Sequence, residues 1–142
     1  MPTRRTQIAE ALVEDIYTKT DVLQGNVQRQ MIFLNEVNDF PFVTFLPREE
    51  LRTHRGDGRK FATLNISMRA YVFNGDPGGE SIAAAEDIAI DLEQDVIDQF
   101  AASHRDLGVE EARVRNFTTD EGLLSPYGIA DLEVAILYEV TT

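Results

Sequence analysis

The strictest pattern in this sequence is a period-two alternation of apolar and polar side chains over residues 61–73. Leucine, isoleucine, methionine, alanine and valine alternate there with threonine, asparagine, serine, arginine and tyrosine. Because successive side chains of a β-strand point to opposite faces of the sheet, this pattern predicts a strand with one buried face and one wetter face. A turn-forming stretch over residues 74–79 ends the strand. Any fold of this chain must therefore cover one side of a sheet.

Two helices, each with one apolar side, are expected to provide this cover. Within residues 3–20 apolar side chains recur every four positions, and Thr3 or Thr6 can cap the first turn. Residues 81–101 predict a second helix with Ser81 as its N-cap. The apolar stripe of this second helix comprises Ile82, Ala85, Ala89, Leu92, Val96 and Phe100.

Four more strands are expected, over residues 27–34, 41–46, 112–118 and 131–140. The elements then follow the order helix, two short strands, loop, strand, helix, two strands. This order predicts an α+β fold, in which a mainly antiparallel sheet carries two helices packed on one face. The length of 142 residues corresponds to a single domain, residues 1–142.

Residues 47–60 show no useful apolar period, and Gly56 and Gly58 lie near their end. We expect this segment to be a long exposed hairpin loop or arm. Unstructured loops of about this length are uncommon in compact domains unless they are functional or disordered.

The formal net charge of −12 is unevenly distributed along the chain. Residues 76–111 contain eleven acids and one base, a net charge of −10, whereas residues 48–69 contain six bases and three acids, a net charge of +3. In the second helix the acids Asp87, Asp91, Asp95 and Asp98 fall within an arc of about 80° on one face. The bases of the arm are Arg48, Arg52, Arg55, Arg59 and Lys60.

This separation of charge has two interpretations. One is a solvated helix face and a mobile loop. The other is self-complementary assembly, in which the basic arm of one subunit meets the acidic face of the next in a head-to-tail ring. Ile90 and Ile97 lie on neither the apolar stripe nor the acidic face, so we expect both to be exposed. They are either incidental or a second contact surface for a neighbouring subunit.

Composition excludes several classes of protein. The chain has no cysteine, which rules out a disulfide framework, a cysteine nucleophile and a thiolate metal site. Its acidic balance argues against a DNA-coating protein and against docking on anionic membranes. No apolar run approaches the ~20 residues of a membrane span, and residues 1–6 lack the apolar core of a signal peptide. We therefore expect a soluble, cytosolic protein with no membrane partner.

No catalytic constellation is apparent. His54 and His104 have no carboxylate or serine at a diagnostic spacing, and both are expected on the surface. The glycine-containing stretch around Asp57 is not followed by the Gly-Lys-Ser/Thr sequence that ends a phosphate-binding loop. The helix aspartates would hold Mg²⁺ or Ca²⁺ only with ligands from other segments, so a metal-dependent hydrolase is a disfavoured alternative. We expect no enzymatic activity, no cofactor and no metal.

Several short stretches resemble one protein family, and together they span nearly the whole chain. The sequence looks like the tail terminator proteins of tailed bacteriophages, also called tail completion or tail-to-head joining proteins. The most telling stretch runs from Thr-Asp-Glu-Gly at residues 119–122 to Pro-Tyr-Gly at residues 126–128. The other stretches are Asn-Asp-Phe-Pro-Phe-Val at 38–43, Arg-Ala-Tyr-Val at 69–72, the acidic helix around 85–88, Arg-Val-Arg-Asn-Phe-Thr at 113–118 and Leu-Glu-Val-Ala-Ile-Leu-Tyr at 132–138.

The resemblance implies a virion structural protein. Such a protein forms a hexameric ring on the last ring of the tail tube, stops tube polymerisation and joins the tail to the neck or head–tail connector; in contractile tails it also meets the tail sheath. It implies an antiparallel sheet with packed helices and a mobile loop that becomes ordered on assembly. It also implies assembly in the host cytoplasm and double-stranded DNA passing through the ring without specific binding. We expect Asp87, Asp91, Asp95 and Asp98 either to face that channel, where acids repel phosphate, or to meet the basic arm of the adjacent subunit. A head–tail adaptor or other neck protein of the same architecture is the alternative.

Overall fold

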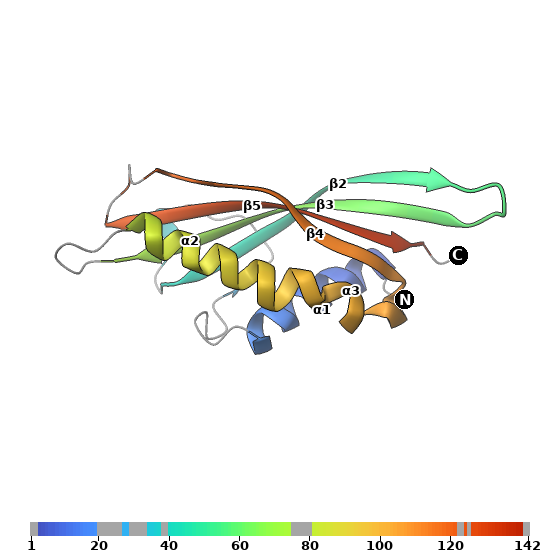
Figure 1. Cartoon of the computed structure of the whole chain (residues 1–142), viewed down its shortest axis with the longest axis horizontal. Helices are drawn as coiled ribbons and strands as arrows, with labels where there is room; N and C mark the ends of the chain where they lie inside the picture. Colours follow the sequence, from blue (N-terminus) through green and yellow to red (C-terminus); the bar gives the residue numbers. More distant parts are fainter. Residues whose placement is uncertain are drawn as a thin grey trace.

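The structure, a computed structural model, describes residues 3–19, 27–28, 34–37, 40–74, 81–121, 124 and 126–140. A long twisted sheet has the strand order β1-β2-β3-β5-β4, with β1 parallel to β2 and the other neighbours antiparallel. The helices lie together on one side of this sheet (Figure 1). The strands are β1 (Val27–Gln28), β2 (Phe42–His54), β3 (Lys60–Phe73), β4 (Val109–Thr119) and β5 (Tyr127–Glu139), and the helices are α1 (Arg4–Lys19), α2 (Ser81–Asp91) and α3 (Asp98–Ser103). The α+β prediction is thus confirmed.

The hydrophobic core lies between the sheet and the helices. On β3 the apolar set of the alternation is buried, and its members face apolar partners on β5: Leu64 pairs with Ile136 and Ile66 pairs with Val134. The expected apolar sides of the helices cover this layer. The core residues of the helices include Ile8, Leu12 and Ile16 of α1 and Leu92, Val96 and Phe100 of the second helical region. Thr3 caps α1, because its Oγ1 accepts a hydrogen bond of 3.2 Å from the backbone N–H of Thr6.

The expected long exposed hairpin loop or arm is an arm, because both of its sides are paired β-strand. Strand β2 continues past Pro47 through a β-bulge and pairs with β3 as far as His54 opposite Lys60. The irregular turn is confined to Arg55–Arg59, where the Arg55 N–H donates to the Arg59 carbonyl at 2.9 Å. The arm shows no apolar period because its outer strand is mostly exposed, so burial sets no pattern there.

The second helical region is also more complex than expected. A π-helical segment, Leu92–Ile97, joins α2 to α3. A π-turn takes up an extra residue, and the side chains that follow it rotate relative to a regular α-helix. This rotation turns Ile97 into the core, where it is fully buried. The expectation that Ile97 is exposed is therefore wrong, whereas Ile90, which precedes the π-turn, keeps 43% exposure.

The remaining strand predictions are confirmed in part. The predicted strands over 112–118 and 131–140 correspond to the longer β4 and β5. In the predicted strand over 27–34, residues 27–28 form β1 and Leu34 begins a short 3₁₀ turn (Leu34–Glu36), while residues 29–33 lie outside the described part of the chain. Ser81 is the first residue of α2 and is buried, while residues 75–80 of the preceding turn are likewise not described.

Candidate assembly surfaces

The first candidate surface is the arm, residues 47–60. Figure 1 shows the arm projecting beyond the helices at one end of the molecule. Every residue from Leu51 to Arg59 is exposed. The exposed residues include an apolar one, because Leu51 keeps 56% exposure. Because the two strands hydrogen-bond to each other, the arm presents these side chains on an ordered backbone.

Two of the arm's predicted bases already have carboxylate partners in their own subunit. Arg52 Nη2 lies 2.8 Å from Glu50 Oε2, and Arg59 Nη2 lies 2.8 Å from Glu139 Oε2. The hydrogen bond from Arg59 lowers the pKa of the Glu139 carboxyl. Part of the arm's positive charge is therefore neutralised within the subunit.

Arg55, at the turn of the arm, is held differently. Its guanidinium lies over the ring of Phe61, 4.1 Å from the ring centroid. Within the described part of the chain no carboxylate forms an ion pair with it. Arg48 also lacks a direct ion pair there and instead donates from Nε to Ser67 Oγ at 2.7 Å. Lys60 is half-buried at the base of the turn.

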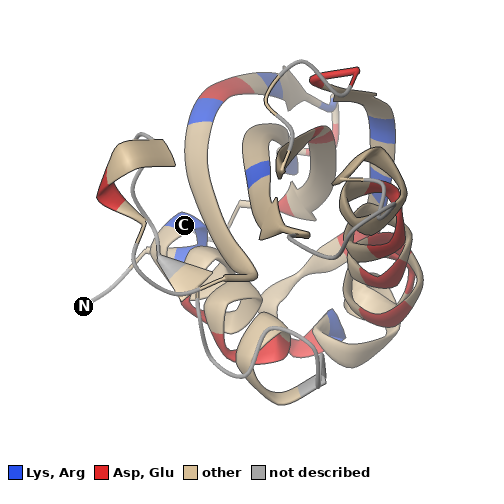
Figure 2. Ribbon diagram, turned by 90° about the vertical axis from the view of Figure 1, so that its left-hand side faces the viewer, with Lys and Arg blue, Asp and Glu red and all other residues tan. Residues whose placement is uncertain are grey.

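The second candidate surface is the acidic side of α2 and its continuation. Asp87, Asp95 and Asp98 are exposed and Asp91 is half-buried, as the helical arc predicts. None of the four pairs with a base in the described residues. Partial burial, and then the charges of Asp95 and Asp87, raise the pKa of Asp91 above its ordinary value. The carboxylates thus repel one another. In Figure 2 acidic positions gather along this helix, while many of the Lys and Arg positions lie on the strands.

The third surface is an exposed aromatic cluster that sequence patterns did not indicate. Phe40, Phe73 and Tyr127 have ring centroids 5.2 to 6.2 Å apart. Phe73 keeps 51% exposure. Phe40 lies just before β2, Phe73 ends β3 and Tyr127 begins β5, so the cluster lies at the opposite end of the sheet from the arm. Two stretches quoted for the family resemblance contain members of this cluster, Phe40 in Asn-Asp-Phe-Pro-Phe-Val and Tyr127 in Pro-Tyr-Gly, but neither indicates that the rings meet.

A groove of about 500 Å³ connects this aromatic cluster to the acidic helix. Phe40 and Phe73 line it on the sheet side, and Ile90, Asp87 and Asp91 line it from α2. The exposed Ile90 therefore borders an apolar groove with carboxylates in its lining. Ile97 does not reach any such surface because it is buried.

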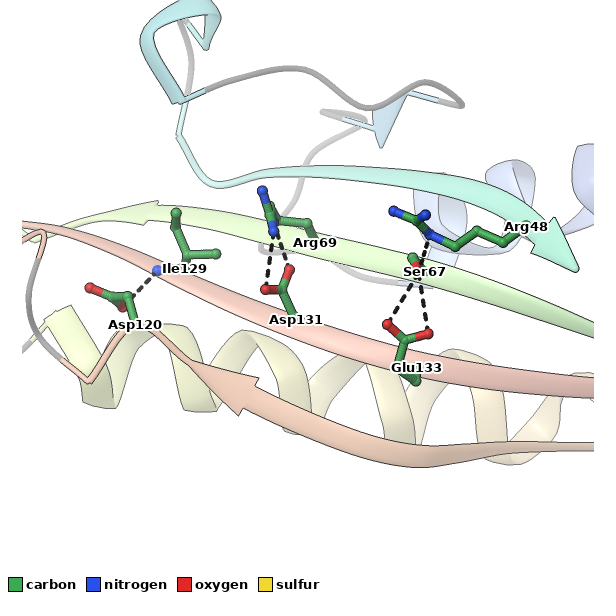
Figure 3. A network of polar contacts seen from close by, with 7 residues as sticks. All are labelled: Arg48, Ser67, Arg69, Asp120, Ile129, Asp131 and Glu133. Atoms are coloured by element: carbon green, nitrogen blue, oxygen red, sulfur yellow. Dashed lines mark hydrogen bonds and ion pairs between the residues drawn. The ribbon is translucent and has the colours of Figure 1, made fainter.

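On the sheet, charged side chains are linked across strands (Figure 3). Arg69 of β3 holds Asp131 of β5 through contacts of 2.6 and 3.2 Å. The Ser67 hydroxyl donates towards the Glu133 carboxylate, with distances of 3.1 and 3.2 Å to its two oxygens. These acids have hydrogen-bonding or basic partners in the subunit, whereas the part of the chain that the structure describes gives the aspartates of α2 no basic partner.

Two further kinds of site to consider in the described residues are a metal-ligand cluster and a membrane-spanning helix. No group of three or more His, Cys, Asp or Glu side chains there could hold a metal ion. No described helix is both long and apolar enough to cross a bilayer. His104 is not a free surface residue as expected, because its Nε2 lies 2.7 Å from Asp15 Oδ2.

Comparison with known proteins complements this geometry. The sequence model of a family described as "Bacteriophage Tail Tube Terminator Protein" matches residues 2–142. The chain is 27% identical over 154 residues to "Tail tube terminator protein p142" of Escherichia phage T5, covering 95% of this chain and 93% of that protein. A solved chain of the "Virion of native gene transfer agent (GTA) particle" has a similar fold, with a TM-score of 0.63, 11% identity and coverage of 90% of this chain and 91% of the other.

The family match extends over α1, the whole sheet and the acidic helix. Its extent agrees with the resemblance carried by the Thr-Asp-Glu-Gly and Pro-Tyr-Gly stretches. The protein is therefore a structural component of a phage tail and not an enzyme. This chain belongs to the bacteriophage tail tube terminator protein family.

Proposed function

We propose that this tail tube terminator works as a ring of six copies on the head-proximal end of the tail tube. The ring ends tube polymerisation, joins the tail to the neck or head–tail connector, and lets double-stranded DNA pass without binding it specifically. In a contractile tail it also meets the end of the sheath. Its partners are then copies of itself, the tube protein and the connector, and assembly takes place in the host cytoplasm.

The observation that carries this proposal is the separation of the basic arm from the acidic helix on one molecule. The arm lies beyond the helices, and the acids of α2 lack basic partners within the described residues (Figures 1 and 2). A contact between two different patches is heterologous, and repetition of such a contact either closes a ring or builds an open filament. A protein that terminates a tube at one plane requires the closed form.

The excess of acid supports a channel that does not hold DNA. Residues 76–111 carry −10, whereas residues 48–69 carry +3, so one arm neutralises only part of one acidic segment. Acidic groups left facing the channel would repel phosphate, while a basic wall would bind DNA with strong salt dependence. We therefore assign part of the acidic side, among Asp87, Asp91, Asp95 and Asp98, to the channel or its rim.

Electron microscopy of cognate tail tubes incubated with the purified protein tests the proposal. We expect a six-fold ring at one end of each tube, and capped tubes that no longer elongate when tube protein is added. The protein without tubes serves as the control for self-assembly. Raising the salt from 50 mM to 500 mM should lower ring occupancy, because screening weakens contacts between opposite charges. Continued elongation of capped tubes, or rings of another symmetry, would contradict the proposal.

A further inference from the structure

The groove beside α2 has the chemistry of a site for an arginine side chain. Phe40 and Phe73 provide aromatic surface, and the carboxylates of Asp87 and Asp91 lie in the same lining. A guanidinium is planar, stacks on aromatic rings and hydrogen-bonds to carboxylates, whereas an ammonium group stacks poorly and acts as a point charge. In the described residues no base forms an ion pair with either carboxylate.

Among the arginines of the arm, Arg55 is the one suited to fill such a site. Arg52 and Arg59 are paired with Glu50 and Glu139 in their own subunit. Arg48 lies at the bulge far from the turn and donates to Ser67. Arg55 has no carboxylate partner in the described residues; its guanidinium lies over Phe61, as that of Arg59 also does, and would leave this ring to enter the groove. It is exposed at the turn of the arm, where a side chain is best placed to enter a groove on another molecule.

Arg55 cannot reach the groove of its own subunit. Strand β3 runs from Lys60 at the arm's turn to Phe73 in the groove lining, over 14 residues. At ~3.3 Å per residue this strand holds the two sites about 45 Å apart. If Arg55 fills the groove, it must therefore be the Arg55 of another copy, whose arm presents it at an exposed turn.

We propose that the groove between Phe40, Phe73 and α2 receives Arg55 of the neighbouring copy, whose guanidinium stacks on the aromatic wall and pairs with Asp87 and Asp91. This proposal rests on the ring proposed above and specifies its subunit contact. The contact is head-to-tail, since it joins the arm end of one copy to the aromatic end of the next. Ile90 and the exposed Leu51 then lie near the contact as its apolar margin.

Cysteine cross-linking on tail tubes tests this contact directly, because the native chain contains no cysteine. A Cβ at Gly56, next to Arg55, would have no atom within 4 Å, so Gly56→Cys is expected to leave the fold unchanged. The partner variant is Ile90→Cys, in the groove lining. The two single variants are mixed with cognate tubes and treated with an oxidant or with a short bismaleimide. The matched control replaces Ile90→Cys by Arg113→Cys on β4, which is also exposed.

We expect Gly56→Cys to cross-link with Ile90→Cys at least tenfold more than with Arg113→Cys. Adding Arg55→Ala to the Gly56→Cys variant should remove most of the cross-link, and adding Arg55→Lys should leave an intermediate yield. Adding Arg59→Ala should change the yield less, because Arg59 binds Glu139 in its own subunit. Equal yields for Arg55→Lys and the unaltered arginine would overturn the stacking role of the guanidinium.

The outcomes separate this contact from the ring itself. Six-fold rings on the tubes without the Gly56–Ile90 cross-link would overturn the groove contact and leave the ring standing. Cross-linking of Gly56→Cys to a tube-protein cysteine variant instead would also overturn it, because the arm would then contact the tube. The absence of any ring from tubes capped by the unaltered protein would overturn both proposals.

Discussion

At the residue scale, several side chains have roles that depend on partners far away in the sequence. Asp120, in the Thr-Asp-Glu-Gly stretch, accepts hydrogen bonds of 3.0 Å from the backbone N–H groups of Leu124 and Ile129, and so closes the β4–β5 connection. Gly128 is required because a Cβ there would lie 2.6 Å from the Ser81 carbonyl oxygen. The stretches that resemble the terminator family thus hold the backbone together where β5 begins.

Tyr138 gives the residue scale a pH-dependent prediction. It is buried, and its hydroxyl donates to a carboxylate oxygen of Glu50. Burial, followed by this hydrogen bond, raises the pKa of Tyr138 well above its ordinary value of 10.0. Tyr138→Phe should lower the free energy of unfolding by about 1–3 kcal/mol at pH 7, because the carboxylate loses a donor.

The pH dependence follows from the direction of this shift. Above pH 10 the unfolded chain loses the phenolic proton while the folded chain keeps it, so the contribution of Tyr138 to stability falls as the pH rises. Urea unfolding of the unaltered protein and of Tyr138→Phe between pH 7 and pH 11 measures this contribution. The control is Tyr17→Phe, because Tyr17 is exposed. A difference between the unaltered protein and Tyr138→Phe that stays constant up to pH 11 would contradict this account.

At the element scale, local periodicity predicted most helices and strands. It did not predict that β2 continues into the arm, or that a π-helical segment follows α2. The alternation of β3 and the four-residue spacing of α1 are local signals of burial, and the structure confirms both. The strand character of residues 48–54 has no such signal, because these residues are exposed and gain their hydrogen bonds from β3. The π-turn in the second helical region likewise depends on packing against the sheet rather than on a local motif.

The two isoleucines provide a test of the π-turn. Regular α-helical spacing gives Ile90 and Ile97 similar surroundings, whereas the structure leaves Ile90 exposed and buries Ile97 completely. Ile97→Asn should therefore lower the free energy of unfolding by about 3 kcal/mol or more, because it buries an amide in the core. Ile90→Asn should change it by about 0.5 kcal/mol at most. Urea denaturation of the matched pair measures both, and equal losses would argue for a regular helix.

At the scale of the whole molecule, we expect the crowded acids of α2 to lower the stability of the free subunit and to serve contacts in the assembly. The acids of α2 crowd together without bases in the described residues, and the pKa of Asp91 is raised by burial and by Asp95 and Asp87. Residues selected for binding another molecule commonly reduce the stability of the free subunit. We therefore expect the separated charges, the groove and the arm all to take part in contacts between copies.

Asp91→Asn tests this trade-off in the unassembled protein. Because the folded state raises the pKa of Asp91, the charged form costs stability at pH 7 and the cost disappears as the pH falls below about 4. The variant should gain roughly 0.5 kcal/mol or less at pH 7, since the half-buried carboxylate is still partly screened by solvent, and nothing at pH 3. Tube capping by the same variant should weaken.

Thermal or urea unfolding at the two pH values measures the first effect, and electron microscopy of capped tubes measures the second. Asp106→Asn, at an exposed position in the turn after α3, is the control for the loss of one negative charge. A variant that is less stable at pH 7 than the unaltered protein would contradict the proposed repulsion.

The sequence alone determined the α+β class, the two helices, the alternating central strand, the division of charge and the family resemblance. The fold class, the helices, the strand and the division of charge follow from local spacing, element order and residue counts, while the resemblance depends on short stretches like those of a known family. The tertiary structure decided that the arm is a paired hairpin, that Ile97 is buried, and that Phe40, Phe73 and the acids of α2 share one groove. These features arise where segments dozens of residues apart supply each other's hydrogen bonds and packing surfaces, and no local pattern encodes such contacts.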